Sequence, residues 1–256
     1  MIYLYGLINV PNLPSNAFLE MTGLQSVPME VSLGCWSLVY EVHDGSDVEP
    51  RRRQLLAHTR VVERMMQFGT VLPARFGLVA QSIEMVAKLV EEKAASIAEE
   101  FEKLRNCVEL GLRLSYPREA ALAATLQSVP ALLAQRTRLV GQGAGAYFAR
   151  AEFGRRLAEA LDNRRGVAQK AIISALRSQL KDFVLRSPET DVEVLRVEVL
   201  VHASQEERIA AMLDELARSS NFAPSAEPLI QIVGPAPVYN FVKLSLAVDY
   251  SAAEEV

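Results

Sequence analysis

Three histidines are the side chains of this sequence best suited to acid–base or metal chemistry. They are His43, His58 and His202, and imidazole both titrates near neutral pH and binds metal ions. No two of them are four residues apart, the spacing that places two ligands on one face of a helix. His58 shares a helical stripe with Val61 and Met65, which favours a partly buried, hydrogen-bonded histidine over a general base. The sequence therefore predicts neither a metal site nor a catalytic histidine.

The segment from Gly141 to Ala146 matches the nucleotide-binding pattern G-x-G-x-x-A and opens a predicted helix. In a dinucleotide site this turn follows a strand, and an acidic residue about twenty positions later binds the ribose. Here the preceding residues include Arg136 and form no clear strand, and Asp162 lies in a helical run. A helix entry without a ligand is the favoured interpretation, so no cofactor is expected. An enzyme that binds a nucleotide at the Gly141–Gly145 turn stays an alternative.

Nucleophilic catalysis has no signature in the sequence either. The pattern G-x-S-x-G is absent, and carboxylates concentrate on predicted helix surfaces, as at Glu91 and Glu99. The two cysteines, Cys35 and Cys107, are too few for a disulfide framework and too far apart for a zinc signature. We therefore expect a non-enzymatic protein in a reducing compartment such as the cytoplasm.

Composition restricts the partners further. The chain has 256 residues, 50% of them hydrophobic and 23% charged, with a formal net charge of −4. Its basic residues are scattered apart from short clusters such as Arg51–Arg53, which argues against nucleic acid as a partner. No apolar run approaches the ~18 residues that span a bilayer, and the N-terminus has no basic region, so no membrane is expected as a partner.

The first half of the chain mixes strands and helices. Helical spacing begins after Pro50, and a longer helix is expected from an N-cap at Ser82. Residues 70–80, TVLPARFGLVA, predict an edge strand or a structured loop. Alternating apolar residues predict strands at Ile2–Ile8, Val27–Leu33, Cys35–Val42 and Cys107–Tyr116. The last of these strands is expected to close a first α+β unit.

The second half begins with helices and ends with strands. Pro117 to Ser187 is helical in pattern, and interruptions at Pro130, Gly141–Gly145 and Gly166 predict three helices. A capping box of Ser204 and Glu207 predicts the start of a further helix. Strands are predicted at Val192–Val201, Leu229–Val233 and Phe241–Val248.

These patterns favour the α+β class with two domains. We expect an N-terminal domain over residues 1–117 and a C-terminal domain over residues 118–256, which is helical over 118–187 and continues strand, helix, strand, strand. Each domain is expected to be a small ferredoxin-like, antiparallel-rich sheet covered by helices, the second with an extra helical segment.

Four stretches together resemble one known family. They are Tyr3–Leu7, the run from His58 through Gly69 to Gly77, the helix entry Gly143–Phe148, and the closing residues Gly234–Val242. Their order and spacing are similar to the GvpL/GvpF family of gas vesicle proteins, over nearly the whole chain. The segment V-L-P-x-R-F-G and the closing G-P-x-P-x-Y-x-F carry most of the resemblance.

Those last two motifs supply the candidate partner-binding residues. Pro235 and Pro237 donate no ladder hydrogen bonds and hold their predecessors extended, so the closing connection is expected to be stiff. Tyr239 either points outward as an anchor for a partner or packs inward at the end of the sheet. Inward packing is the favoured interpretation for Tyr239. Phe76 is likewise expected to pack in the core, and Arg75 is expected to pair with a carboxylate. The candidate contacts are Arg75, Phe76, Pro235, Pro237, Tyr239 and Phe241.

The resemblance implies a non-enzymatic accessory protein required for gas vesicle assembly. It implies binding to the hydrophobic shell protein GvpA and to other gas vesicle proteins during nucleation, and a location in the cytoplasm and at the gas vesicle. A permanent minor component of the vesicle wall is the alternative within the same system.

Overall fold

A computed structural model describes residues 1–140, 146–224 and 226–243. Contacts divide the chain into two compact units, which are described separately. Unit 1 contains Met1–Glu109 together with the segment from Pro235 onward, and unit 2 contains Leu110–Gly234. The chain thus leaves unit 1 within one strand and returns to it within another.

Unit 1 is built on a five-stranded antiparallel sheet around a fully buried central strand, β1 (Ile2–Ile8). All seven β1 residues are buried, as expected for a strand that is covered on both faces. Strand β1 pairs with β3, β4 and β5, and β2 pairs with β3 at the edge. The other strands are β2 (Met29–Leu33), β3 (Trp36–Val42), β4 (Val71–Pro73) and β5 (Val79–Ala80).

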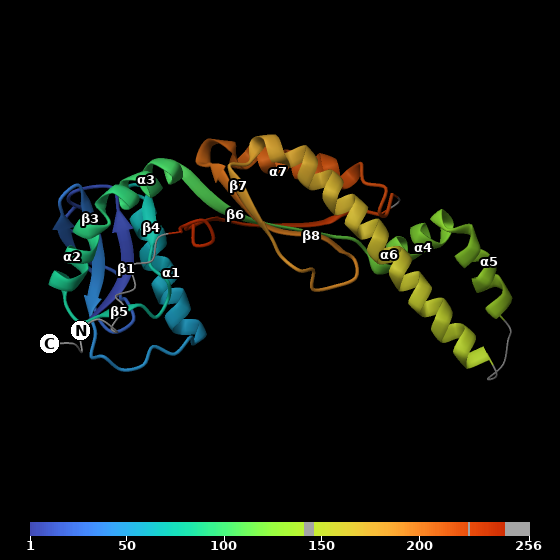
Figure 1. Ribbon diagram of the computed structural model, residues 1–256, viewed down its shortest axis with the longest axis horizontal. Helices are drawn as coiled ribbons and strands as arrows, with labels where there is room; N and C mark the ends of the chain where they lie inside the picture. The colour runs from blue at the N-terminus through green and yellow to red at the C-terminus, as the bar shows by residue number, and fades with distance from the viewer. Residues whose placement is uncertain (141–145, 225, 244–256) are drawn as a thin grey trace. The chain divides into compact units, whose positions relative to one another are not determined.

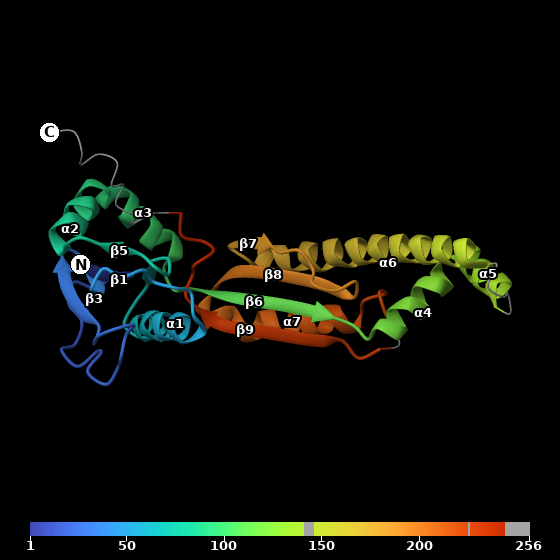
Figure 2. The ribbon, with the colours of Figure 1, turned by 90° about the horizontal axis from the view of Figure 1, so that it is seen from below.

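Helices cover both faces of this sheet (Figures 1 and 2). The helices are α1 (Arg52–Met66), α2 (Ile83–Glu92) and α3 (Ala94–Leu104). Helix α1 buries His58, Val61, Val62 and Met65, which confirms the predicted stripe. Ser82 caps α2 as predicted, because its Oγ accepts a hydrogen bond from the Met85 N–H at 3.3 Å. The single long helix expected there is two helices, which meet at Lys93, whose backbone is not helical.

Unit 2 carries a four-stranded sheet in the order β7-β8-β6-β9. Helices α6 and α7 lie on one face of it, and α4 and α5 pack against α6 (Figure 1). The strands are β6 (Cys107–Ser115), β7 (Asp182–Leu185), β8 (Glu193–His202) and β9 (Leu229–Ala236). The helices are α4 (Arg118–Ser128), α5 (Pro130–Leu139), α6 (Tyr147–Leu176) and α7 (Glu206–Arg218). The α+β class with two antiparallel-rich sheets is therefore confirmed.

Three helix predictions in this unit were wrong. Helix α6 passes through Gly166 without a break, and a Cβ at Gly166 would meet no atom within 4 Å. A glycine costs only about 1 kcal/mol inside a helix, which packing along thirty residues outweighs. The helical pattern also does not reach Ser187, because residues Asp182–Leu185 form β7. The Ser204–Glu207 capping box does not form, since α7 begins at Glu206 after a short 3-10 turn.

The predicted assignment of strands to sheets also needs correction. Strand β6 does not close the first sheet but lies between β8 and β9 in the second. Strand β9 extends to Ala236, and Phe241–Lys243 are turn and coil rather than strand, while residues 244–248 lie outside the described part. The predicted domains, 1–117 and 118–256, differ from the two contact units chiefly because Pro235–Lys243 belong with unit 1. Whether the chain divides into separately folding domains at residue 117 stays a prediction.

Candidate functional site

A hydrogen-bond relay in unit 1 joins two of the motif stretches, Tyr3–Leu7 and the run from His58 to Gly77. The backbone N–H of Gly77 donates to the Tyr3 hydroxyl at 3.2 Å, and that oxygen lies 2.8 Å from Nδ1 of His58. The Tyr3 oxygen has two lone pairs and one proton, so it can accept from Gly77 and also bond Nδ1 in either tautomer of His58. Gly77 has φ +86°, which a glycine adopts without strain. The relay therefore fixes the Arg75–Gly77 turn against β1 and α1.

His58 is a neutral structural group in this relay. Its side chain is only 2% exposed, and burial lowers the pKa of His58 to about 4, with a smaller opposing effect from the backbone of Ala74. The prediction of a buried, hydrogen-bonded histidine is confirmed. A histidine that stays uncharged and enclosed at neutral pH organises the side chains around it.

Aromatic rings surround His58 on several sides. The ring of Phe76 lies edge-on at 5.8 Å, Tyr5 is stacked at 5.4 Å, and Tyr239 is tilted at 6.1 Å between centroids. Tyr3 also contacts Phe76 edge-on at 6.3 Å. These separations are those of stabilising aromatic pairs. One aromatic cluster therefore joins the two ends of the chain within unit 1, and its members are Tyr3, Tyr5, His58, Phe76 and Tyr239.

Two hydrogen-bonding contacts fix the closing residues 235–243, which contain Tyr239, to unit 1. The buried carboxylate of Glu109 accepts hydrogen bonds from the backbone N–H of Asn240, at 3.0 Å, and from the Asn240 amide. The Lys103 ammonium donates to the Phe241 carbonyl at 3.2 Å. Val238 and Phe241 are buried between these contacts. The closing motif is therefore a turn fixed to unit 1, which explains its Pro and aromatic residues.

Replacement of Asn240 by alanine is expected to lower the free energy of unfolding by about 2 kcal/mol. The variant removes the side-chain donor to the buried carboxylate of Glu109. Urea unfolding measures the change. The control is Gln231→Ala, at an exposed position of β9, which should change stability by less than about 0.5 kcal/mol. Equal effects of the two variants would contradict the anchoring role.

The six predicted contact residues separate into exposed and buried groups. Arg75 and Pro235 are exposed, and Tyr239 is 36% exposed although its ring packs on His58. Pro237 and Phe241 are buried, and Phe76 is half-buried. The expected ion pair of Arg75 is not seen, because no carboxylate within the described ranges lies within 4.0 Å of its guanidinium. All six belong to unit 1, and whether they contact a partner stays a prediction.

Sequence reasoning missed a buried carboxylate in the same unit. Glu41 on β3 is fully buried and accepts hydrogen bonds from the Tyr5 hydroxyl at 3.1 Å and from three consecutive backbone N–H groups, those of Leu24, Gln25 and Ser26. A Cβ on Gly23 would lie 1.9 Å from a Glu41 oxygen, so only glycine allows this approach. The one sequence signal is a Glu within the largely apolar run of β3.

Comparison with known proteins gives a consistent assignment. The sequence matches the family described as "Gas vesicle synthesis protein GvpL/GvpF" over residues 1–243. The chain belongs to the GvpL/GvpF family. It is 28% identical to gas vesicle protein F of Streptomyces sp. (strain CB03234) over 94% of this chain and 99% of that protein. The family resemblance read from the sequence is confirmed.

Two solved structures share the fold of this GvpL/GvpF chain. The crystal structure of GvpF from Anabaena sp. PCC7120 superposes with a TM-score of 0.80 at 22% identity, covering 95% of this chain and 98% of that one. The structure of GvpF from Microcystis aeruginosa gives 0.72 at 21% identity, covering 95% and 99%. At these identities the comparison supports the fold alone.

Metal binding and membrane insertion have no counterpart among the described residues of this GvpL/GvpF chain. Within residues 1–140, 146–224 and 226–243, no group of three or more His, Cys, Asp or Glu side chains is placed to hold a metal ion. The Gly141–Gly145 turn lies outside the described residues, so the nucleotide alternative is not tested by the structure. Among the helices described, none has the length and apolar character needed to cross a bilayer.

Proposed function

We propose that this protein is a non-enzymatic accessory factor of gas vesicle assembly that binds the hydrophobic shell protein transiently. Membership of the GvpL/GvpF family supports the gas vesicle role. The observation that supports binding is the exposed edge strand β9. The protein is expected in the cytoplasm and at the forming vesicle, with GvpA and other gas vesicle proteins as partners.

Strand β9 has the properties of an edge that accepts a partner strand. Among the described strands it pairs with β6 alone, and none of its eight residues is buried. The exposed fractions are 59% for Leu229, 37% for Ile232 and 49% for Val233. Edge strands in soluble proteins are commonly protected by charge, and an apolar edge of this length is a template for strand addition. Pro235 has no N–H, which limits such pairing at the end of the strand.

The shell protein fits this edge by its chemistry. Subunits that assemble into a gas-filled wall expose apolar and strand-edge surface before assembly, and such surface aggregates unless it is covered. A strand edge of the shell protein would form main-chain hydrogen bonds with β9, and its apolar surface would be covered by the apolar side chains of β9. Separately, in unit 1, the exposed Arg75 guanidinium, without an ion pair among the described residues, offers a contact for a carboxylate of a partner.

Replacement of Ile232 by lysine is expected to weaken binding of purified shell protein at least tenfold, about 1.4 kcal/mol. A lysine on the edge strand opposes the approach of an apolar strand, while the exposed position preserves the fold. Surface-immobilised shell protein and a titration of each variant measure the affinity. The matched control is Leu185→Lys on the opposite edge strand β7, where the side chain is 46% exposed. Equal affinities of wild type and Ile232→Lys would exclude β9 as the contact.

The role in the cell is tested with the same two variants. A strain that lacks the gene should form no normal vesicles by electron microscopy, and the wild type and Leu185→Lys should restore them, whereas Ile232→Lys should not. Ordinary vesicles in the deletion strain would overturn the assembly role. Immunodetection on washed vesicles separates a transient factor, which is lost on washing, from a permanent wall component, which is retained.

A further inference from the structure

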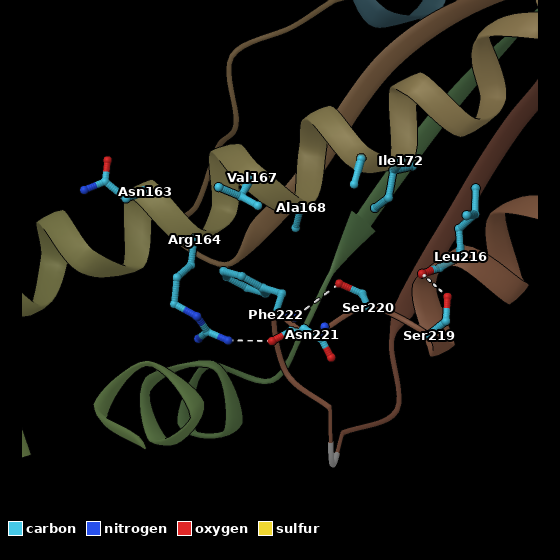
Figure 3. A pocket seen from close by; sticks show the side chains of 11 residues that line it. Asn163, Arg164, Val167, Ala168, Ile172, Leu216, Ser219, Ser220, Asn221 and Phe222 are labelled. Carbon is cyan, nitrogen blue, oxygen red and sulfur yellow. Dashed lines mark hydrogen bonds between the residues drawn. The ribbon is translucent and has the colours of Figure 1, made fainter. Parts of the chain in front are cut away.

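A cavity of about 440 Å³ lies within unit 2, between α6 and the segment that follows α7 (Figure 3). Its volume falls in the range of small-molecule sites, roughly 300 to 1,000 Å³. One wall is the apolar side of α6 with Ala168, Ala171 and Ile172, and Leu216 faces it from α7. Val167 stands at the mouth and is 70% exposed. The cavity is therefore open, largely apolar and of a size that suits a ligand.

One end of this cavity carries a positive charge. Arg164 extends from α6 beside the ring of Phe222, with its guanidinium carbon 5.7 Å from the ring centroid (Figure 3). Nη1 donates to the Thr125 hydroxyl at 2.8 Å, and Nη2 donates to the Asn221 carbonyl at 2.5 Å. Both acceptors are uncharged, and a guanidinium has five N–H groups. Three of its N–H groups therefore have no acceptor within the described part of the chain.

The charge of Arg164 lacks a counter-ion in this part of the protein. No carboxylate of the described residues lies within 4.0 Å of its guanidinium. Partial burial lowers the pKa of Arg164, as it does for a cation that loses water without gaining an anion. The neighbouring Arg165, in contrast, pairs with Asp162. A half-buried arginine at an apolar cavity, with free N–H groups and no anion, is arranged for an anionic ligand.

We propose that this cavity binds a small amphiphilic carboxylate, with the head group on Arg164 and a short apolar chain along Ala168, Ala171 and Ile172. The planar guanidinium matches a carboxylate with two parallel hydrogen bonds. The apolar wall removes the chain from water. This inference stands apart from the proposed function, because it concerns a different surface and a different kind of ligand.

A purely structural role for Arg164 is the competing explanation. Its two hydrogen bonds join α6 to α4 and to the segment after α7, so the side chain could serve only to hold these elements together. A structural clamp does not distinguish a carboxylate from an amine. The test therefore compares ligands of one chain length and different charge on the full-length protein.

Calorimetric titration with octanoate is expected to give saturable binding, and octylammonium and octanol are expected to bind at least tenfold more weakly. Arg164→Gln should weaken octanoate binding at least tenfold. Arg156→Gln, on the same helix and hydrogen-bonded to Gln135 away from the cavity, should leave it unchanged. No octanoate binding, or equal binding of the three ligands, would overturn the proposal.

A second variant keeps the test valid if Arg164→Gln fails to fold. Val167→Glu changes an exposed side chain at the mouth, and its carboxylate, one helical turn from Arg164, repels or replaces the ligand head group. Octanoate binding should fall at least tenfold in Val167→Glu and persist in Val167→Lys. Equal octanoate binding in these two variants overturns the proposal, and shell-protein affinity, measured separately, reports on the proposed function.

Discussion

Replacement of Glu41 by alanine is expected to lower the free energy of unfolding by about 3 kcal/mol, measured by urea denaturation. The carboxylate is the acceptor for the Tyr5 hydroxyl and for the N–H groups of Leu24, Gln25 and Ser26. Each buried donor left without an acceptor costs about 1–3 kcal/mol, and water that enters the more exposed loop recovers part of this loss. The loop should also lose protection, so hydrogen exchange at these three amides should accelerate.

The matched control for this prediction is Glu30→Ala. Glu30 lies on the neighbouring strand β2, is half-buried and accepts one side-chain hydrogen bond, from Ser37 at 2.9 Å. Its loss leaves one buried donor, the Ser37 hydroxyl, without this acceptor, against four donors at Glu41, so it should cost only about 1 kcal/mol. If Glu41→Ala were as stable as Glu30→Ala, the carboxylate would not organise the loop.

Acidification from pH 6.5 to pH 4 is expected to destabilise the protein through His58 by up to roughly 3 kcal/mol. The pKa of His58 is lowered from 6.5 to about 4 in the folded protein because the imidazole is buried. Between these two values the unfolded chain binds one proton more than the folded chain, so a fall in pH favours unfolding. The contribution is complete above pH 6.5 and is lost as the pH approaches 4.

Urea unfolding over this pH range, for the wild type and His58→Asn, isolates the effect. The variant should be less stable at pH 7, because the asparagine places its polar atoms differently toward the Tyr3 hydroxyl, but its stability should fall less steeply with acid. In the wild type, the imidazole resonances of His58 should titrate near pH 4. A His58 that titrates near 6.5 would contradict both its burial and its role in the relay.

Part of the candidate site could be predicted from the sequence. The motif residues Tyr3, His58, Phe76 and Tyr239 were singled out from separate stretches, and the structure brings them into one cluster. The preference for packing at Tyr239 and Phe76 agrees with their ring contacts. The expected ion pair of Arg75 is not found among the described residues, because pairing depends on which carboxylate the fold brings near, and a motif contains no such information.

Glu41, Glu109 and Arg164 lay outside the motif-based reasoning. Their partners are separated from them by 15 to 131 residues in the chain. A charged side chain in an apolar strand or a helical run looks like any solvated residue until its surroundings are known. Burial, which makes these groups important, is a property of the packed molecule.

The sequence by itself determined the family, the α+β class and the elements with strong local periodicity, such as β1 and α1. The spacing of their apolar residues determines which face is buried. The same spacing also distinguishes a strand from a helix, because the two elements have different side-chain periods. The tertiary structure alone decided that β6 joins the second sheet, that α6 continues through Gly166, and that the closing motif returns to unit 1. These outcomes depend on strand pairing and burial between residues far apart in the chain. The free energies of these long-range contacts exceed the local conformational preferences, and no short segment of sequence contains both partners.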